Sequence, residues 1–162
     1  MRKFLAVFLV PAFLLCGLRS SFADAGQNLV GIWKLVSIAA EDAETGQRTQ
    51  FWGEHPNGRL ILTASGEMMA LLTGEGRKAP HSEAERGAAF GSMVAYSGRY
   101  RVEGDRFVTT VDMAWNESWV GTEQVRHYRI EGNTLHIETE PQPAAGFGNR
   151  VTRYVLVWDR EH

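Results

Sequence analysis

The sequence has a single cysteine among 162 residues, Cys16, and it lies in a segment that we expect to be removed. The chain begins with the basic pair Arg2-Lys3, continues through an apolar run over residues 4–15, and then shows the small-residue pattern Ser21-Phe22-Ala23. This order is typical of a secretory signal peptide over residues 1–23, cleaved after Ala23. The mature chain then has neither a disulfide nor a thiol nucleophile, although we expect it to be periplasmic or secreted.

The sequence also lacks a hydrophobic run of membrane-spanning length and a cluster of basic residues. The apolar run is shorter than the roughly 20 residues that a membrane helix needs, so an uncleaved anchor is the less favoured alternative. Three of the 17 Lys and Arg residues and none of the 19 Asp and Glu residues lie in residues 1–23, which leaves 14 basic against 19 acidic residues. This balance argues against nucleic-acid binding, and we expect no stable membrane insertion once the signal is removed.

Motifs of common catalytic and metal sites are missing as well. The sequence has no Gly-x-Ser-x-Gly element, no phosphate-binding loop and no dinucleotide fingerprint. His127 and His136 alternate with charged residues, so we interpret them as outer-face residues and expect no metal site and no cofactor. No catalytic residue is assigned. Acid–base chemistry by His55, Glu117 or Glu123 stays open as an alternative.

What the sequence does have is one hairpin pattern repeated within residues 96–139. Residues 97–108 and 126–137 each show an alternating strand, then Glu-Gly-Asp or Glu-Gly-Asn, then a second alternating strand. Gly followed by Asp or Asn between such strands indicates a two-residue turn, and this turn fixes the register. In each hairpin one face is apolar and aromatic and the other is charged, as in a sheet with one buried face.

The apolar face of these hairpins supplies most of the candidate binding residues. Arg126 is the one charged residue on that face, and the register places it opposite Thr139. A buried guanidinium needs a partner, so we expect Arg126 to hold the polar end of a ligand. The alternatives are a pair with Glu117 or Glu123, or a bulge that turns Arg126 outward. With Trp119 from the connection between the hairpins, the predicted ligand-binding residues are Tyr96, Tyr100, Thr109, Met113, Trp115, Trp119, Arg126 and Tyr128.

The remaining chain predicts further strands at 31–38, 47–52, 59–64, 67–73 and 151–159. A two-residue turn at Ser65-Gly66 would place four residues on one face of the hairpin that it joins: Leu60, Leu62, Met69 and Leu71.

One short helix is predicted at about residues 83–90, because Ser82-Glu83-Ala84-Glu85 is a capping-box pattern. We expect this helix to cover one barrel opening. Strands joined by hairpins favour an antiparallel meander, and closing it into a barrel removes both exposed sheet edges.

Several stretches resemble a known family. Gly31-Ile32-Trp33 is similar to the Gly-x-Trp start of lipocalins and fatty-acid-binding proteins, and residues 51–63, 96–100 and 119–126 resemble the bacterial and fungal lipocalin-like domain family. This resemblance implies an all-β, antiparallel up-and-down barrel of about 8–10 strands with an internal cavity. The domain would span residues 29–162, after a flexible leader over 24–28. The resemblance also implies an arginine from the last strand packed on Trp33, for which Arg150 and Arg153 are the candidates.

These observations favour a protein that binds a small, mostly apolar molecule inside the barrel. The alternative is an enzyme that uses the same cavity for isomerisation, cyclisation or hydrolysis of an apolar metabolite. A third possibility is an interaction protein whose charged outer face binds a partner. Because the same fold serves all three, the choice depends on the cavity and its side chains.

Overall fold

The computed structural model describes residues 28–161, so the predicted signal peptide and most of the predicted leader lie outside the described residues. The described chain is mostly strand, with the α-helix α2, two short 3-10 helices and two further helical residues at 28–29. In chain order the elements are β1 (Gly31–Asp42), β2 (Arg48–Thr49), β3 (Asn57–Leu62), β4 (Glu67–Thr73), α2 (Glu83–Gly91), β5 (Met93–Glu103), β6 (Arg106–Ala114), η1 (Glu117–Trp119), β7 (Glu123–Glu131), β8 (Thr134–Thr139), β9 (Gln142–Ala144), η2 (Ala145–Phe147) and β10 (Arg150–Arg160).

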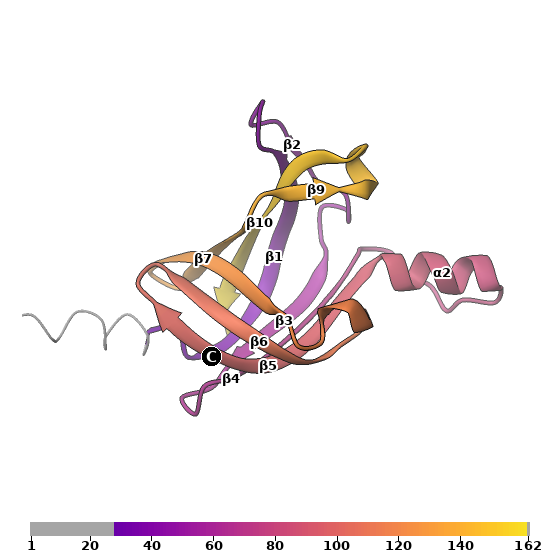
Figure 1. Cartoon of the computed structure of the whole chain (residues 1–162). Coiled ribbons are helices and arrows are strands. Elements are labelled where there is room, and N and C mark those ends of the chain that lie inside the picture. The colour runs from indigo at the N-terminus through magenta and orange to yellow at the C-terminus, as the bar shows by residue number, and fades with distance from the viewer. Residues whose placement is uncertain (1–27, 162) are drawn as a thin grey trace, which may run out of the picture.

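The strands form a closed antiparallel barrel, which confirms the predicted fold class. From β3 to β8 each strand pairs with its neighbour in the chain, and β1 pairs with both β3 and β10. The barrel therefore has eight strands, and the short strands β2 and β9 extend β1 and β10 beyond it (Figure 1). Closure leaves no long strand edge exposed.

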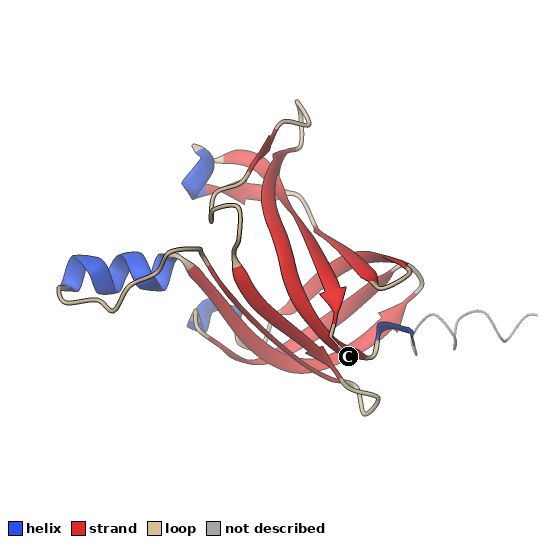
Figure 2. Cartoon of the chain, turned by 180° about the vertical axis from the view of Figure 1, so that it is seen from behind, coloured by secondary structure: helices blue, strands red, loops and turns tan. Residues whose placement is uncertain are grey.

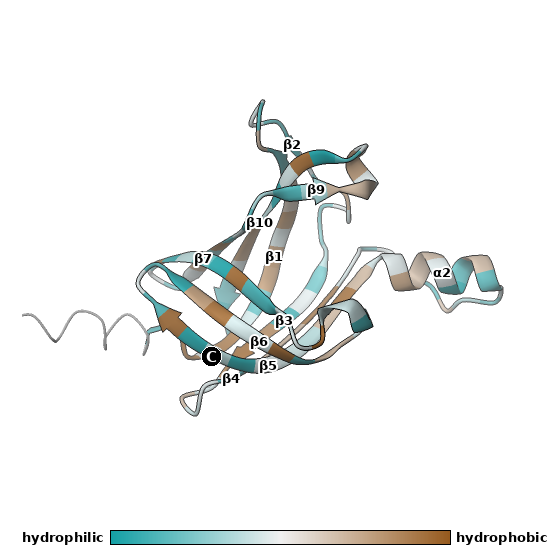
Figure 3. Ribbon diagram, viewed as in Figure 1, coloured by the Kyte–Doolittle hydropathy of each residue, from teal (hydrophilic) through white to brown (hydrophobic). Residues whose placement is uncertain are grey.

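The two repeated hairpins have the predicted register. Val102 pairs with Phe107 in the first hairpin, and Tyr128 pairs with Ile137 in the second. Apolar and polar residues alternate along these strands (Figure 3). The turn glycines have positive φ angles, 67° at Gly104 and 61° at Gly132, which L-residues rarely adopt. The Gly-Asp and Gly-Asn turns therefore predicted correctly which nearby residues share a face of the sheet.

The prediction for the hairpin between β3 and β4 was wrong by one residue. The Thr63 N–H donates to the Glu67 carbonyl at 2.9 Å, so the loop has three residues, and Gly66 takes the left-handed position at φ 84°. Leu62 consequently pairs with Met68. This shift reverses the faces of β4. Met68, Ala70 and Leu72 are buried with Leu60 and Leu62, and Met69 and Leu71 face outward.

The predicted face of Met113 was also wrong. Between Ser97 and Gly98 the register of β5 on β6 shifts, because Ser97 pairs with Met113 and Gly98 pairs with Val111. The Ser97 hydroxyl donates to the carboxylate of Asp112, the extra residue of this bulge, at 2.7 Å. A bulge exchanges the faces of the residues that follow it. Met113 is therefore 64% exposed on the outer surface.

Helix α2 confirms the predicted helix but not its predicted position. The Ser82 hydroxyl accepts a hydrogen bond from the Glu85 N–H at 3.2 Å, and the Glu85 carboxylate accepts one from the Ser82 N–H, as in a capping box. The helix buries no residue and extends away from the barrel instead of covering its opening (Figures 1 and 2). Across residues 28–161, no helix combines the length and apolar character that crossing a membrane requires.

The barrel core surrounds Trp33, which is fully buried. The guanidinium over its ring belongs to Arg160 and not to Arg150 or Arg153. Those two arginines pair with Asp42 and Glu41 instead. Arg160 lies at the last position of β10, next to Trp33 across the β1–β10 ladder, whereas the other two lie near the opposite end of that strand.

Candidate functional site

The two ends of the barrel differ in construction. The tight hairpins β3–β4, β5–β6 and β7–β8 turn at the same end as Trp33. The opposite end carries longer connections: the residues before β3, helix α2, and the 3-10 helices η1 and η2. The loops of this second end, which we call the mouth, bring additional side chains to the barrel interior, so the candidate site lies there.

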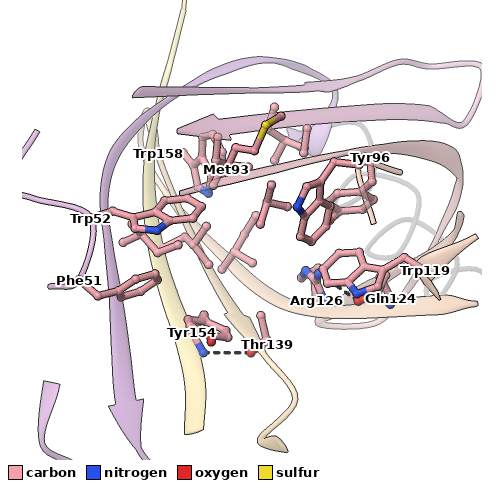
Figure 4. Close-up of a pocket in the computed structure, with 18 of the residues that line it drawn as sticks. Phe51, Trp52, Met93, Tyr96, Trp119, Gln124, Arg126, Thr139, Tyr154 and Trp158 are labelled. Carbon is pink, nitrogen blue, oxygen red and sulfur yellow. Dashed lines mark hydrogen bonds between the residues drawn. The ribbon is translucent and has the colours of Figure 1, made fainter. Parts of the chain in front are cut away.

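A cavity of about 390 Å³ extends from the mouth into the barrel. Nine of its 23 lining residues are aromatic. In the close-up view Phe51, Trp52 and Tyr154 lie on one side, and Tyr96 and Trp119 lie on the other (Figure 4). Cavities of this size and mostly apolar lining are typical of sites for small organic molecules.

Arg126 is the only charged side chain that lines this cavity in the described part of the chain. The register predicted it correctly, because Arg126 pairs with Thr139 and with Phe107 of β6. Its guanidinium donates to the Val125 carbonyl at 2.8 Å and to the Gln124 side-chain oxygen at 3.3 Å. The guanidinium carbon lies 5.8 Å from the Tyr96 ring centroid and 6.0 Å from that of Trp119.

The alternatives considered for Arg126 do not occur among residues 28–161. Glu123 pairs with Arg101 on the outer face, at 2.7 Å between the guanidinium Nη1 and the carboxylate. No salt bridge within the described residues includes Arg126, and no bulge interrupts the pairing of β7 with β8. Among the described residues, the cation that faces the cavity therefore has neutral oxygens as its acceptors.

The structure brings four of the eight predicted binding residues to the cavity: Tyr96, Trp115, Trp119 and Arg126. Trp115 and Trp119 contact each other edge to face, with ring centroids 4.9 Å apart. Tyr96 in turn contacts Trp119 with a centroid distance of 5.4 Å. These three rings form one aromatic wall beside Arg126.

The other four predicted residues do not line the cavity. Met113 lies on the outer surface, as described above. Thr109 is fully buried, and its hydroxyl has no hydrogen-bond partner among residues 28–161. The Tyr128 hydroxyl is likewise buried without a partner, whereas the Tyr100 hydroxyl donates to the Thr63 carbonyl at 2.8 Å. Burial raises the pKa of both tyrosines, so both stay protonated near neutral pH.

Sequence reasoning predicted Trp119 from one connection but missed Phe51, Trp52 and Phe147 from two others. Residues 47–52 were predicted as a strand, but only Arg48–Thr49 pairs with β1. Phe51 and Trp52 instead fold against the cavity, where Phe51 contacts Phe147 of η2 at 5.5 Å and Tyr154 of β10 at 5.5 Å between ring centroids. The one available signal was the density of aromatic residues in a segment without alternation.

The candidate acid–base residues lie outside the cavity lining. His55, Glu117 and Glu123 are all exposed, and none of them lines the cavity. His127 lies opposite Glu138, as expected from the register, and its ring Nε2 is within hydrogen-bond distance of the Glu140 carboxylate, at 2.7 Å. Within residues 28–161 no group of three or more His, Cys, Asp and Glu side chains could hold a metal ion.

The match to a family model agrees with the barrel. The family model described as "Lipocalin-like domain" matches residues 30–161, nearly the whole described chain. No curated protein sequence matches the chain. Among solved structures, an uncharacterized protein from Bacteroides eggerthii DSM 20697 is similar, with 12% identity and a TM-score of 0.41 over 82% of this chain and 98% of that one.

Proposed function

Because the chain belongs to the family of lipocalin-like domains, we propose that it binds a small, mostly apolar molecule inside its barrel. The observation that carries this proposal is the cavity of about 390 Å³ with its aromatic lining. Small barrels of eight strands are often filled completely by side chains. Here the interior is filled at the Trp33 end and hollow at the mouth, an arrangement that favours binding over a purely structural role.

The lining favours a ligand with a large apolar surface. The aromatic rings on both sides of the cavity bury apolar area and favour face and edge contacts with a ligand ring. Each square ångström of apolar ligand surface removed from water contributes about 25 cal/mol. Arg126 and Gln124 lie next to each other on one side of the cavity, so they would orient the polar end of the ligand.

The alternative, an enzyme that acts on an apolar metabolite, would use the same cavity. Its titratable candidates in the lining are Tyr96, Arg126 and Tyr154. Burial raises the pKa of Tyr154, so this hydroxyl would donate a proton rather than accept one near neutral pH. Ligand turnover that is lost in Tyr154→Phe would favour this alternative over binding alone.

The test is native mass spectrometry of the protein purified from its own cells. We expect a non-covalently bound mass that organic solvent releases, and a Val94→Trp variant that lacks it, because Val94 lines the cavity and a larger side chain would fill it. A folded wild-type protein without bound mass that also fails to bind the neutral fluorophore N-phenyl-1-naphthylamine would contradict the proposal.

We also propose that the protein is exported and that residues 1–23 are removed. The basic start, the apolar run and the Ser21-Phe22-Ala23 pattern support this proposal. The intact mass of the protein from its own cells should then equal that of a chain that begins at Asp24. A mass that retains Cys16 would contradict cleavage after Ala23.

A further inference from the structure

Within this proposed function, we infer that the ligand is an organic anion, a carboxylate or a similar acid attached to an apolar ring system, and that Arg126 binds the acid group. The inference depends on the proposed cavity function. It adds the charge of the ligand and the residue that recognises it.

The first step is the electrostatic balance of the cavity. A guanidinium that is partly removed from water is stabilised by an anion or by a full set of hydrogen bonds. Every ion pair between the described residues leaves Arg126 out, and the cavity lining within 28–161 contains no Asp or Glu. The cavity therefore carries one positive charge that the protein does not neutralise, and a bound anion would neutralise it.

The second step is the geometry of the guanidinium. One terminal nitrogen donates to the Val125 carbonyl at 2.8 Å and the other to the Gln124 side chain at 3.3 Å. An arginine side chain has five N–H donors, so further donors remain for a ligand after these two bonds. The two internal bonds also hold the guanidinium in place. Less side-chain conformational entropy is therefore lost when an anion binds.

The third step is the position of Arg126 relative to the aromatic lining. Tyr96 and Trp119 lie within 6.0 Å of the guanidinium carbon. Phe51, Trp52 and Tyr154 lie across the cavity (Figure 4). A ligand with its acid group at Arg126 would therefore extend its apolar body toward these three rings. This arrangement favours an acid with rings over a fully polar anion, because the opposite wall is mostly aromatic surface.

The experiment compares two fluorophores with the same ring system. N-phenyl-1-naphthylamine is neutral, and 8-anilino-1-naphthalenesulfonate carries one sulfonate on those rings. Arg126→Met removes the charge and keeps most of the apolar side chain. The matched control is Arg129→Met on the same strand, because Arg129 faces outward and pairs with Glu131 at 3.0 Å. Dissociation constants are measured by fluorescence titration, and circular dichroism checks each fold.

We expect Arg126→Met to weaken sulfonate binding at least about tenfold while the neutral fluorophore changes less than about threefold. Arg129→Met should change neither. If Arg126→Met does not fold, Arg126→Gln replaces it. An equal change for both fluorophores, or no change for the sulfonate, would overturn the anion inference and leave the cavity function standing. Neutral binding that is absent in the wild type, or that Val94→Trp does not reduce, would overturn the cavity function and the inference with it.

Discussion

The guanidinium of Arg160 lies over the ring of Trp33, with its central carbon 4.0 Å from the ring centroid. Its Nη1 group donates to the Val30 carbonyl at 2.8 Å, and the Trp33 indole N–H donates to the Leu29 carbonyl at 3.0 Å. Arg160 therefore ties the end of β10 to the start of β1 at the barrel end opposite the mouth. A cation over a tryptophan ring is favourable, particularly when one side is shielded from water.

We expect Arg160→Met to lower the free energy of unfolding by about 2 kcal/mol, because it removes the cation–π contact and leaves the Val30 carbonyl without this donor. Urea denaturation measures the change. Binding of N-phenyl-1-naphthylamine should stay the same, because Arg160 does not line the cavity. Arg129→Met, which removes an exposed ion pair, should change stability by less than about 0.5 kcal/mol. Equal losses in the two variants would contradict a specific role for Arg160.

The sequence was sufficient to predict the fold class. It also predicted the register of two hairpins, because their turn residues favour one register. Gly104-Asp105 and Gly132-Asn133 left no competing loop length. Ser65-Gly66 was ambiguous, since Gly66 suits a two-residue turn and equally the left-handed position of a three-residue loop. Both faces of the flanking strands are apolar, so the hydrophobic pattern did not favour either register.

The alternation of residues along strands could not predict the part of the candidate site that the connections supply. Arg126 and Tyr96 follow from alternation along paired strands, and both line the cavity. Phe51 and Phe147 come from connections without regular pairing, where no periodicity states which way a side chain points. The bulge that turns Met113 outward has no local signal either, because apolar alternation continues through it. The register shift lies at Gly98, which has no side chain to meet the Thr110 carbonyl.

Gly98 should be intolerant of any side chain. A Cβ atom at this position would lie 2.0 Å from the Thr110 carbonyl oxygen, a backbone atom that cannot move without disturbing the ladder. We expect Gly98→Ala to lower the free energy of unfolding by about 3 kcal/mol or more. Gly87→Ala is the matched control, since a Cβ there meets no atom within 4 Å and alanine favours the helix by about 1 kcal/mol. A Gly98→Ala protein with wild-type urea stability would contradict the close approach.

The Glu41 carboxylate should make stability depend on acid pH. Glu41 is buried, and it accepts hydrogen bonds from Arg48 at 2.6 Å and from Arg153 at 2.7 Å. The bond from Arg48, followed by that from Arg153, lowers the pKa of Glu41 below its ordinary value. Because the folded protein favours the ionised form, this stabilisation is present above the unfolded-state pKa and is lost as the pH falls through the folded one.

We therefore expect Glu41→Gln to be less stable than the wild type by about 1–2 kcal/mol at pH 7. The difference should shrink as the pH falls below about 4.5, because the carboxyl of the unfolded chain then binds a proton that the folded carboxylate still resists. Urea denaturation midpoints of both proteins at several pH values measure how the stability difference changes with pH. The contributions of the other acidic groups cancel, because both proteins contain them. A difference that stays constant down to pH 3 would show that the carboxylate charge does not contribute.

Glu75 should position the aromatic side of the cavity mouth. Its carboxylate accepts hydrogen bonds from the backbone N–H groups of Glu54 at 2.9 Å and His55 at 3.1 Å, and its own N–H donates to the Trp52 carbonyl at 2.8 Å. Gly53 allows this approach, because a Cβ there would lie 2.3 Å from the Glu75 carboxylate. The three bonds fix the segment that carries Phe51 and Trp52.

We expect Glu75→Ala to weaken the binding of N-phenyl-1-naphthylamine about three- to tenfold, because the aromatic segment must then be ordered when the ligand binds. Stability should change by less than about 1 kcal/mol, since Glu75 is exposed. Glu75→Gln keeps one acceptor oxygen and should lie between the wild type and Glu75→Ala. The control is Glu67→Ala at the opposite barrel end, which removes an exposed pair with Arg99. Unchanged affinity in Glu75→Ala, or an equal loss in Glu67→Ala, would show that Glu75 does not position the mouth.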